Sequence, residues 1–106
     1  MNLNQLTVPS LDLTKAVPFY VKLGLKLIVE SLPDYARFEC PDGHSTFSIH
    51  RADSLPKGEG IYVYFECINL DEYVNELIKK GIVFEQTPTN QKWLWREARL
   101  KDVDGN

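Results

Sequence analysis

Glu97 and Arg99, two charged residues near the end of the chain, have the types and the spacing that acid–base chemistry requires. Alternate residues of a β-strand point to the same side, so a strand over this segment places both side chains on one face. A carboxylate in that position can donate or accept a proton while the guanidinium binds an anionic group, which makes both residues candidate catalytic residues. The same spacing also produces an ordinary ion pair on an open face, and this alternative stays open.

The two cysteines carry no recognisable metal or redox motif. Cys40 and Cys67 stand far apart in the sequence and form no CxxC pair. Residues 1–5 have neither the basic region nor the apolar region of a secretory signal. The sequence therefore predicts a reduced, cytoplasmic protein with two buried thiols.

The composition fits one globular domain. The chain has 106 residues, of which 43% are hydrophobic, enough for one core and too few for two. With a net charge of -3, it has no run of like charge that could follow a phosphate backbone. No apolar stretch approaches the roughly 20 residues that span a bilayer. We therefore expect a single domain that has neither nucleic acid nor a membrane as its partner.

An internal repeat describes the elements that must position the candidate residues. An alternating strand followed by an amphipathic helix extends from Leu6 to Leu25 and recurs, without a gap, from Val63 to Ile82. Three further strands, at residues 26–30, 35–40 and 45–50, follow the first helix. The repeating unit is therefore βαβββ, which predicts an α+β fold.

Both predicted helices have recognisable ends. Asp12 and Asn69 are typical N-caps, while Gly24 and Gly81 can adopt the left-handed conformation that ends a helix. Pro18 lacks a backbone N–H and crowds the carbonyl four residues before it. We therefore expect a kink at this proline or a later start of the first helix.

The two copies divide the domain into module one, residues 1–57, and module two, residues 58–106. Module two contains an added loop at residues 86–92 and ends at Asn106, on a turn that module one follows with another strand. We therefore expect the last strand of module two to be missing. The segment from Trp95 to Lys101 should then lie at or near a sheet edge or a subunit contact. Because bare edges pair with other chains, we expect a homodimer.

Two blocks of sequence carry a resemblance to a known family. Residues 11–25 read Leu-Asp-Leu-Thr-Lys-Ala-Val-Pro-Phe-Tyr-Val-Lys-Leu-Gly-Leu, and residues 95–106 read Trp-Arg-Glu-Ala-Arg-Leu-Lys-Asp-Val-Asp-Gly-Asn. With the tandem βαβββ units, they resemble the glyoxalase, bleomycin resistance and extradiol dioxygenase (vicinal oxygen chelate) superfamily over essentially the whole chain. The resemblance implies a curved mixed sheet that forms a cup, with the helices on its convex face.

The resemblance also implies where a metal ion would bind. Metal-dependent members hold a divalent ion in the cup with residues of the first and last strand of each unit. These positions fall on Gln5, Ser48, Tyr62 and a position beyond Asn106. Gln5 suits the pattern, and His50, on the same face as Ser48, is a second candidate ligand. Because Ser48 and Tyr62 are poor ligands for Zn or Ni, a divalent metal is not the favoured cofactor and glyoxalase I activity is not expected.

Hydroxyl groups and aromatic rings dominate the expected lining of the cup. The predicted ligand-cup residues are Thr7, Ser48, Tyr62, Tyr64 and Trp95. Such a lining suits a planar or polar organic molecule of modest size. The alternative is that the aromatic residues fill the cup or bury a dimer contact.

Two classes of function follow from the resemblance. The first is an enzyme related to the lyases, isomerases or dioxygenases of the superfamily, which acts on a small organic molecule with an altered or lost metal site. The second is a metal-independent binding protein that sequesters a drug or a metabolite. The partner is a small-molecule ligand in both cases, and its identity does not follow from the fold.

Overall fold

A computed structural model describes residues 1–106, and the predicted α+β architecture is confirmed. In chain order the elements are β1 (Gln5–Ser10), α1 (Leu13–Leu23), β2 (Lys26–Ser31), β3 (Tyr35–Glu39), β4 (Thr46–Arg51), α2 (Leu70–Lys79), β5 (Gln86–Asn90) and β6 (Arg96–Arg99). The chain divides into two compact units. The first unit contains residues 1–60 and 102–106, and the second contains residues 61–101.

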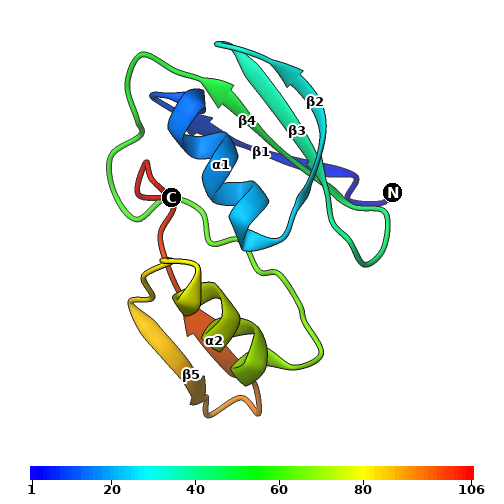
Figure 1. Ribbon diagram of the computed structural model, residues 1–106, viewed down its shortest axis with the longest axis vertical. Helices are drawn as coiled ribbons and strands as arrows, with labels where there is room; N and C mark the ends of the chain where they lie inside the picture. Colours follow the sequence, from blue (N-terminus) through cyan, green and yellow to red (C-terminus); the bar gives the residue numbers. More distant parts are fainter. The chain divides into compact units, whose positions relative to one another are not determined.

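The first unit is a mixed four-stranded sheet with one helix on it. The strand order is β1-β4-β3-β2, in which β1 runs parallel to β4 and the other pairs are antiparallel. Figure 1 shows α1 lying across one face of this sheet. Apolar and polar residues alternate along β1, β3 and β4, as expected for a sheet covered on one side. The buried sheet residues of the core are Val8, Ala36, Phe38, Phe47 and Ile49.

Helix α1 begins at Leu13 and runs without interruption through Pro18. The side chain of Asp12 accepts a hydrogen bond from the backbone N–H of Thr14, so the predicted N-cap is confirmed. The expected later start of this helix is wrong. Pro18 is exposed, whereas the residues on the opposite side of the helix pack into the core, and this burial outweighs the missing hydrogen bond.

Residues 102–106 belong to the first unit through a set of hydrogen bonds. The hydroxyl of Tyr20 donates to Asp102 Oδ2 at 2.5 Å, and the backbone N–H of Leu11 donates to Asp104 Oδ1 at 2.8 Å. The side chain of Asn106 donates to the carbonyl of Pro9 at 3.0 Å. The Asp-x-Asp-Gly-Asn turn is therefore attached to both α1 and the end of β1.

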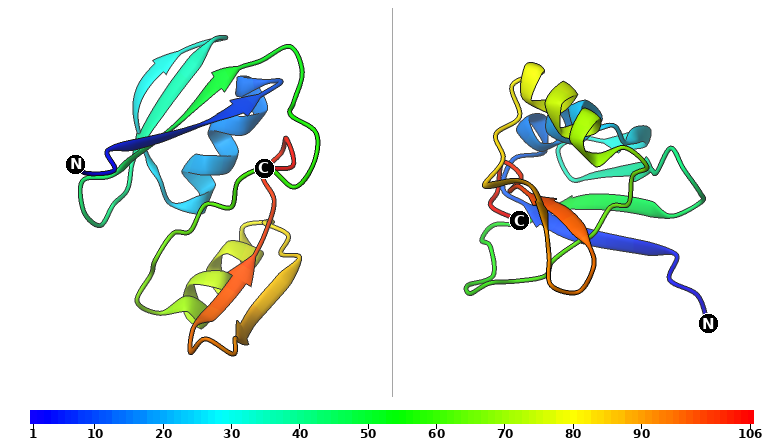
Figure 2. Two further views of the ribbon diagram at one scale, coloured as in Figure 1. Left: turned by 180° about the vertical axis from the view of Figure 1, so that it is seen from behind. Right: turned by 90° about the horizontal axis from the view of Figure 1, so that it is seen from below.

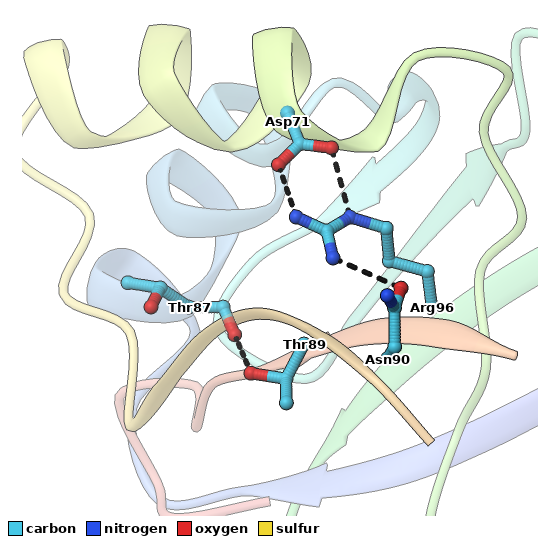
Figure 3. A network of polar contacts seen from close by, with 5 residues as sticks. All are labelled: Asp71, Thr87, Thr89, Asn90 and Arg96. Carbon is cyan, nitrogen blue, oxygen red and sulfur yellow. Dashed lines mark hydrogen bonds and ion pairs between the residues drawn. The ribbon is translucent and has the colours of Figure 1, made fainter. Parts of the chain in front are cut away.

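The second unit pairs α2 with a two-stranded antiparallel sheet, β5-β6. Arg96 Nε and Nη2 donate to the two carboxylate oxygens of Asp71 at 2.9 and 2.7 Å, and Nη1 donates to Asn90 Oδ1 at 3.0 Å (Figure 3). One arginine thus joins the first turn of α2 to both strands. Hydrogen bonding to Asp71, together with its charge, raises the pKa of Arg96 above its ordinary value.

Both ends of α2 lie where the sequence predicts them, but the residue before the helix does not cap it with its side chain. The helix follows Asn69, as predicted, but the Asn69 side chain makes no capping hydrogen bond. Asp71 and Glu72 in the first turn place negative charge near the helix N-terminus. Gly81 has a φ of 93°, so the predicted left-handed residue after the helix is confirmed.

Two predictions for module two are wrong. Residues 86–90 form the strand β5, although a loop was predicted there. These residues have no apolar alternation that would indicate a strand, and they form one because they pair with β6. Residues 63–65 were predicted as a strand and belong to no strand of either sheet. In the first unit β1 is held by β4, and no strand of the second unit takes that place.

The predicted edge position of the segment around Trp95 to Lys101 is confirmed, because its strand β6 pairs only with β5. Cys40 and Cys67 are free thiols, and both are half-buried rather than buried as predicted. Neither helix has the length and apolar character needed to cross a membrane. The expected homodimer stays a prediction.

Candidate functional site

The face of the first sheet opposite α1 is polar, and no helix of this unit covers it. In the view from behind (Figure 2), the strands of the first unit stand in front of α1. We call the polar side chains of β1, β3 and β4 on this open face, which hydrogen bonds connect, the polar cluster. Its members are Gln5, Thr7, Tyr35, Arg37, Thr46 and Ser48.

Gln5 is the centre of the polar cluster. Its Nε2 donates to Ser48 Oγ at 3.1 Å and to the Tyr35 hydroxyl at 3.4 Å, while its Oε1 accepts from Thr46 Oγ1 at 3.0 Å. The hydroxyls of Thr7 and Ser48 lie 2.6 Å apart. The register of β1 on β4 explains these contacts, because it pairs Gln5 with Thr46 and Thr7 with Ser48.

Ser48 and Thr7 have different exposures within this cluster. Ser48 is fully buried, with a relative exposure of 0%, whereas Thr7 is exposed. A buried hydroxyl requires partners, and the hydrogen bonds with Gln5 and Thr7 supply them. The cluster therefore presents a preorganised surface in which Thr7 and Gln5 lie closer to solvent than Ser48.

Arg37 is the one charged member of the polar cluster. Its Nη2 donates to Thr46 Oγ1 at 3.4 Å, a long hydrogen bond. Its Nε is buried and has no hydrogen-bond partner. No carboxylate forms an ion pair with it. Arg37 therefore keeps a positive charge on a half-buried face with most of its donors unused.

The two candidate metal ligands, Gln5 and His50, lie at different places on the open face. Gln5 is opposite Thr46 and His50 is opposite Pro9, so they are about 13 Å apart along the strands, at ~3.3 Å per residue. This separation exceeds what one ion can bridge. The groups around Gln5 are hydroxyls and one guanidinium, which do not fit a Zn or Ni site. No group of three or more His, Cys, Asp or Glu residues is arranged to hold a metal.

In the second unit, Glu97 and Arg99 form an ion pair. Arg99 Nε and Nη2 donate to the same carboxylate oxygen, Glu97 Oε1, at 3.2 and 2.9 Å. This hydrogen bonding raises the pKa of Arg99 above its ordinary value. The guanidinium therefore stays protonated and does not act as a general acid. Glu97 is 8% exposed, and its other oxygen, Oε2, is buried without a hydrogen-bond partner.

The aromatic ligand-cup residues of the second unit are exposed. Tyr62, Tyr64 and Trp95 have relative exposures of 62%, 64% and 56%. The rings of Tyr64 and Trp95 meet edge to face, with centroids 5.8 Å apart. This contact fixes the two rings relative to each other and leaves aromatic surface free to stack on a planar group.

Sequence reasoning missed Tyr35 and Arg37 as members of the candidate site. The signal was present in the repeat, which aligns Arg37 with Arg99 and Tyr35 with Glu97. A strand parity that places Glu97 and Arg99 on one face also places Tyr35 and Arg37 together. Applying the repeat in both directions would have identified them.

Comparison with known proteins agrees with this architecture. A family model described as Glyoxalase/Bleomycin resistance protein/Dioxygenase superfamily matches residues 2–106. The structure is similar to TnmS3, an antibiotic binding protein from Streptomyces sp. CB03234, with a TM-score of 0.83, 22% identity and coverage of 100% of this chain and 90% of that chain. No curated protein sequence matches the chain.

Two further solved structures have the same fold. A glyoxalase/bleomycin resistance protein/dioxygenase from Nocardioides matches with a TM-score of 0.79 and 24% identity, over 99% of this chain and 78% of that one. Lactoylglutathione lyase from Agrobacterium tumefaciens matches with a TM-score of 0.79 and 18% identity, over 99% and 88%. At these identities the likeness establishes the fold, and the family match over nearly the whole sequence establishes the family. The chain belongs to the glyoxalase/bleomycin resistance protein/dioxygenase superfamily.

Proposed function

We propose that this protein binds a small organic molecule on the open face of the first sheet, through the polar cluster and without a metal ion. The observation that carries the proposal is the connected set of neutral donors and acceptors around Gln5, on a face that no helix of the unit covers. Ligand sites combine such placed polar groups with aromatic or apolar surface. Apart from Arg37, the groups of the cluster are hydroxyls and an amide, which favour hydrogen bonding to an organic ligand over coordination of Zn or Ni.

The antibiotic-binding relative supports the same class of function. TnmS3 shares the fold over the full length of this chain. That protein is described as an antibiotic binding protein, and a binding role of this kind requires no catalytic metal. Sequestration of a drug or a metabolite is therefore the function we propose for this chain.

Catalysis at Glu97 is a second candidate function, in the manner of a lyase, an isomerase or a dioxygenase relative. The observation that favours it is the buried, unpartnered Oε2 of Glu97, since Arg99 occupies only Oε1. A free oxygen on a held carboxylate can accept a proton from a bound molecule. With Glu97 as the proton acceptor, Glu97→Gln should abolish turnover of any substrate found, whereas the exposed-residue control Glu59→Gln should leave the turnover rate unchanged.

The test of the binding proposal is a thermal-shift screen with planar and polar organic compounds, antibiotics included, run with EDTA and with added divalent metals. We expect particular compounds to raise the melting temperature equally in both conditions, because ligand binding to the folded state stabilises it. Binding constants for the best compound then locate the site. Thr7→Ala should weaken binding by roughly 2-fold to 13-fold, which corresponds to the net free energy of one hydrogen bond, and the control Thr87→Ala should not.

Two outcomes contradict this proposal. One is a melting temperature that rises only with a particular divalent metal, together with a stoichiometric metal content of the purified protein; Gln5 and His50 are then the residues to substitute first. The other is binding that Thr7→Ala leaves unchanged, because the open face of the first sheet would then not be the site.

A further inference from the structure

We infer that the ligand of the open face carries a carboxylate group and that Arg37 is the residue that receives it. This inference rests on the proposed binding function and names the chemical class of its ligand. Its starting point is charge pairing across the chain. Of the four arginines, only Arg37 has no ion pair. The paired ones are Arg51 with Asp34 and Asp53, Arg96 with Asp71, and Arg99 with Glu97.

The internal repeat provides a matched comparison for Arg37. Its counterpart Arg99 is neutralised by Glu97, two residues earlier on the same strand face. The first unit has Tyr35 in place of that glutamate, so the same arginine position keeps its charge. Tyr35 instead accepts a hydrogen bond from Gln5. The first unit therefore contains a cation whose carboxylate partner has been replaced by a neutral group.

The donors of Arg37 are arranged to accept a planar anion. Nη2 makes only the 3.4 Å hydrogen bond to Thr46, and Nη1 donates to no residue. A guanidinium presents two parallel N–H groups that match the two oxygens of a carboxylate. Nε is buried without a partner, so the guanidinium is held in an environment where an unpaired charge is costly and a pairing anion is correspondingly favoured.

The surroundings of Arg37 favour a ligand group with one negative charge over a ligand group with two. The neighbouring members of the polar cluster, Tyr35, Thr46 and Ser48, are neutral and do not repel an anion. Glu39 shares the strand face, but it forms no ion pair with Arg37 and lies across from Lys26. A dianionic phosphate would require a second cation, and the cluster has none. The geometry therefore favours a monoanionic organic carboxylate.

A matched pair of probes tests this assignment: 1-naphthoate and its neutral analogue 1-naphthamide, which share the aromatic ring. We expect naphthoate to bind at least tenfold more tightly than the amide and to perturb NMR signals of residues in β1, β3 and β4. Arg37→Gln should reduce the affinity for naphthoate at least tenfold and leave the affinity for the amide unchanged. Arg37→Lys retains the charge but not the two parallel N–H donors. Its affinity for naphthoate should lie between that of the natural protein and that of Arg37→Gln. Arg51→Gln is the control, because Arg51 is exposed and already paired with aspartates.

The outcomes separate this inference from the proposed function. If both probes bind the open face equally, or if Arg37→Gln weakens both equally, the carboxylate assignment is wrong while binding at this face stands. If neither probe perturbs the signals of β1, β3 and β4, the carboxylate assignment is contradicted, whereas the thermal-shift screen and Thr7→Ala decide binding at this face. Circular dichroism of Arg37→Gln and Arg37→Lys establishes that each variant is folded before affinities are compared.

Discussion

Tyr20 illustrates how one side chain serves both the core and the attachment of residues 102–106. Its ring is buried and packs against Phe38 and Phe47, with ring centroids 5.6 and 4.8 Å away. Its hydroxyl donates to Asp102. Burial, and then this hydrogen bond and the charge of Asp102, raise the pKa of Tyr20 far above its ordinary value.

Replacing Tyr20 by Phe should lower the free energy of unfolding by about 1–3 kcal/mol, because the ring is kept and a hydrogen bond to a charged group is lost. The raised pKa adds a pH dependence. The hydrogen bond contributes fully below about pH 10, the ordinary pKa of tyrosine, and its contribution declines above it. Urea unfolding between about pH 8 and about pH 11 should therefore show a steeper loss of stability in the natural protein than in Tyr20→Phe. Parallel curves would contradict this role.

The residues of the candidate site were only partly predictable from sequence. Thr7 and Ser48 were predicted to line the cup and Gln5 to be a metal ligand in it, and all three belong to one hydrogen-bonded cluster. Alternation alone gives the face of a side chain and not its partners. The ion pair of Arg99 and the unpaired state of Arg37 depend on distances that only the folded strands define.

At the level of elements, the C-terminal end of α1 was the most predictable feature because it is encoded locally. Gly24 has a φ of 117°, and its N–H donates to the carbonyls of Tyr20 and Val21. The N–H of Leu25 then returns to the carbonyl of Tyr20 at 3.1 Å. This left-handed ending is what a glycine after an amphipathic stretch predicts.

Gly24→Ala should destabilise the first unit by about 1–2 kcal/mol, because a Cβ is strained in the left-handed region. Gly24→Asn should cost less, since asparagine tolerates that region better. Denaturant midpoints measured at constant m-value give the comparison. Equal losses for the two variants would mean that packing around Gly24, and not its backbone conformation, sets the cost.

The strands show where local pattern stops being sufficient. β2, β3 and β4 were predicted within one residue of their ends, because runs of strand-forming residues between turns define them. β5, with the sequence Gln-Thr-Pro-Thr-Asn, has no such alternation and exists because β6 pairs with it. Residues 63–65 have a good strand pattern but belong to no strand. Strand formation is settled by pairing between distant segments, which sequence periodicity does not report.

At the scale of the whole molecule, the opening segments of the two repeat copies should differ in how well their backbone amides are protected from hydrogen exchange. β1 pairs with β4 along its full length, whereas its counterpart near residues 61–67 belongs to no strand. The most protected amides of residues 5–10 should therefore exchange with solvent at least tenfold more slowly than the amides of Tyr62, Val63 and Tyr64. Hydrogen exchange followed by NMR measures this directly. Comparable protection of both segments would show that the second has found a strand partner in solution.

The hydrogen bonds that attach residues 102–106 to α1 and β1 also bear on how the protein is made. A ribosome synthesises β1 and α1 early, but the carboxylates that Tyr20 and Leu11 contact lie 82 and 93 residues further along the chain. Domains usually fold in the order of their synthesis. Here the buried hydroxyl of Tyr20 lacks its hydrogen-bond partner until Asp102 has been synthesised.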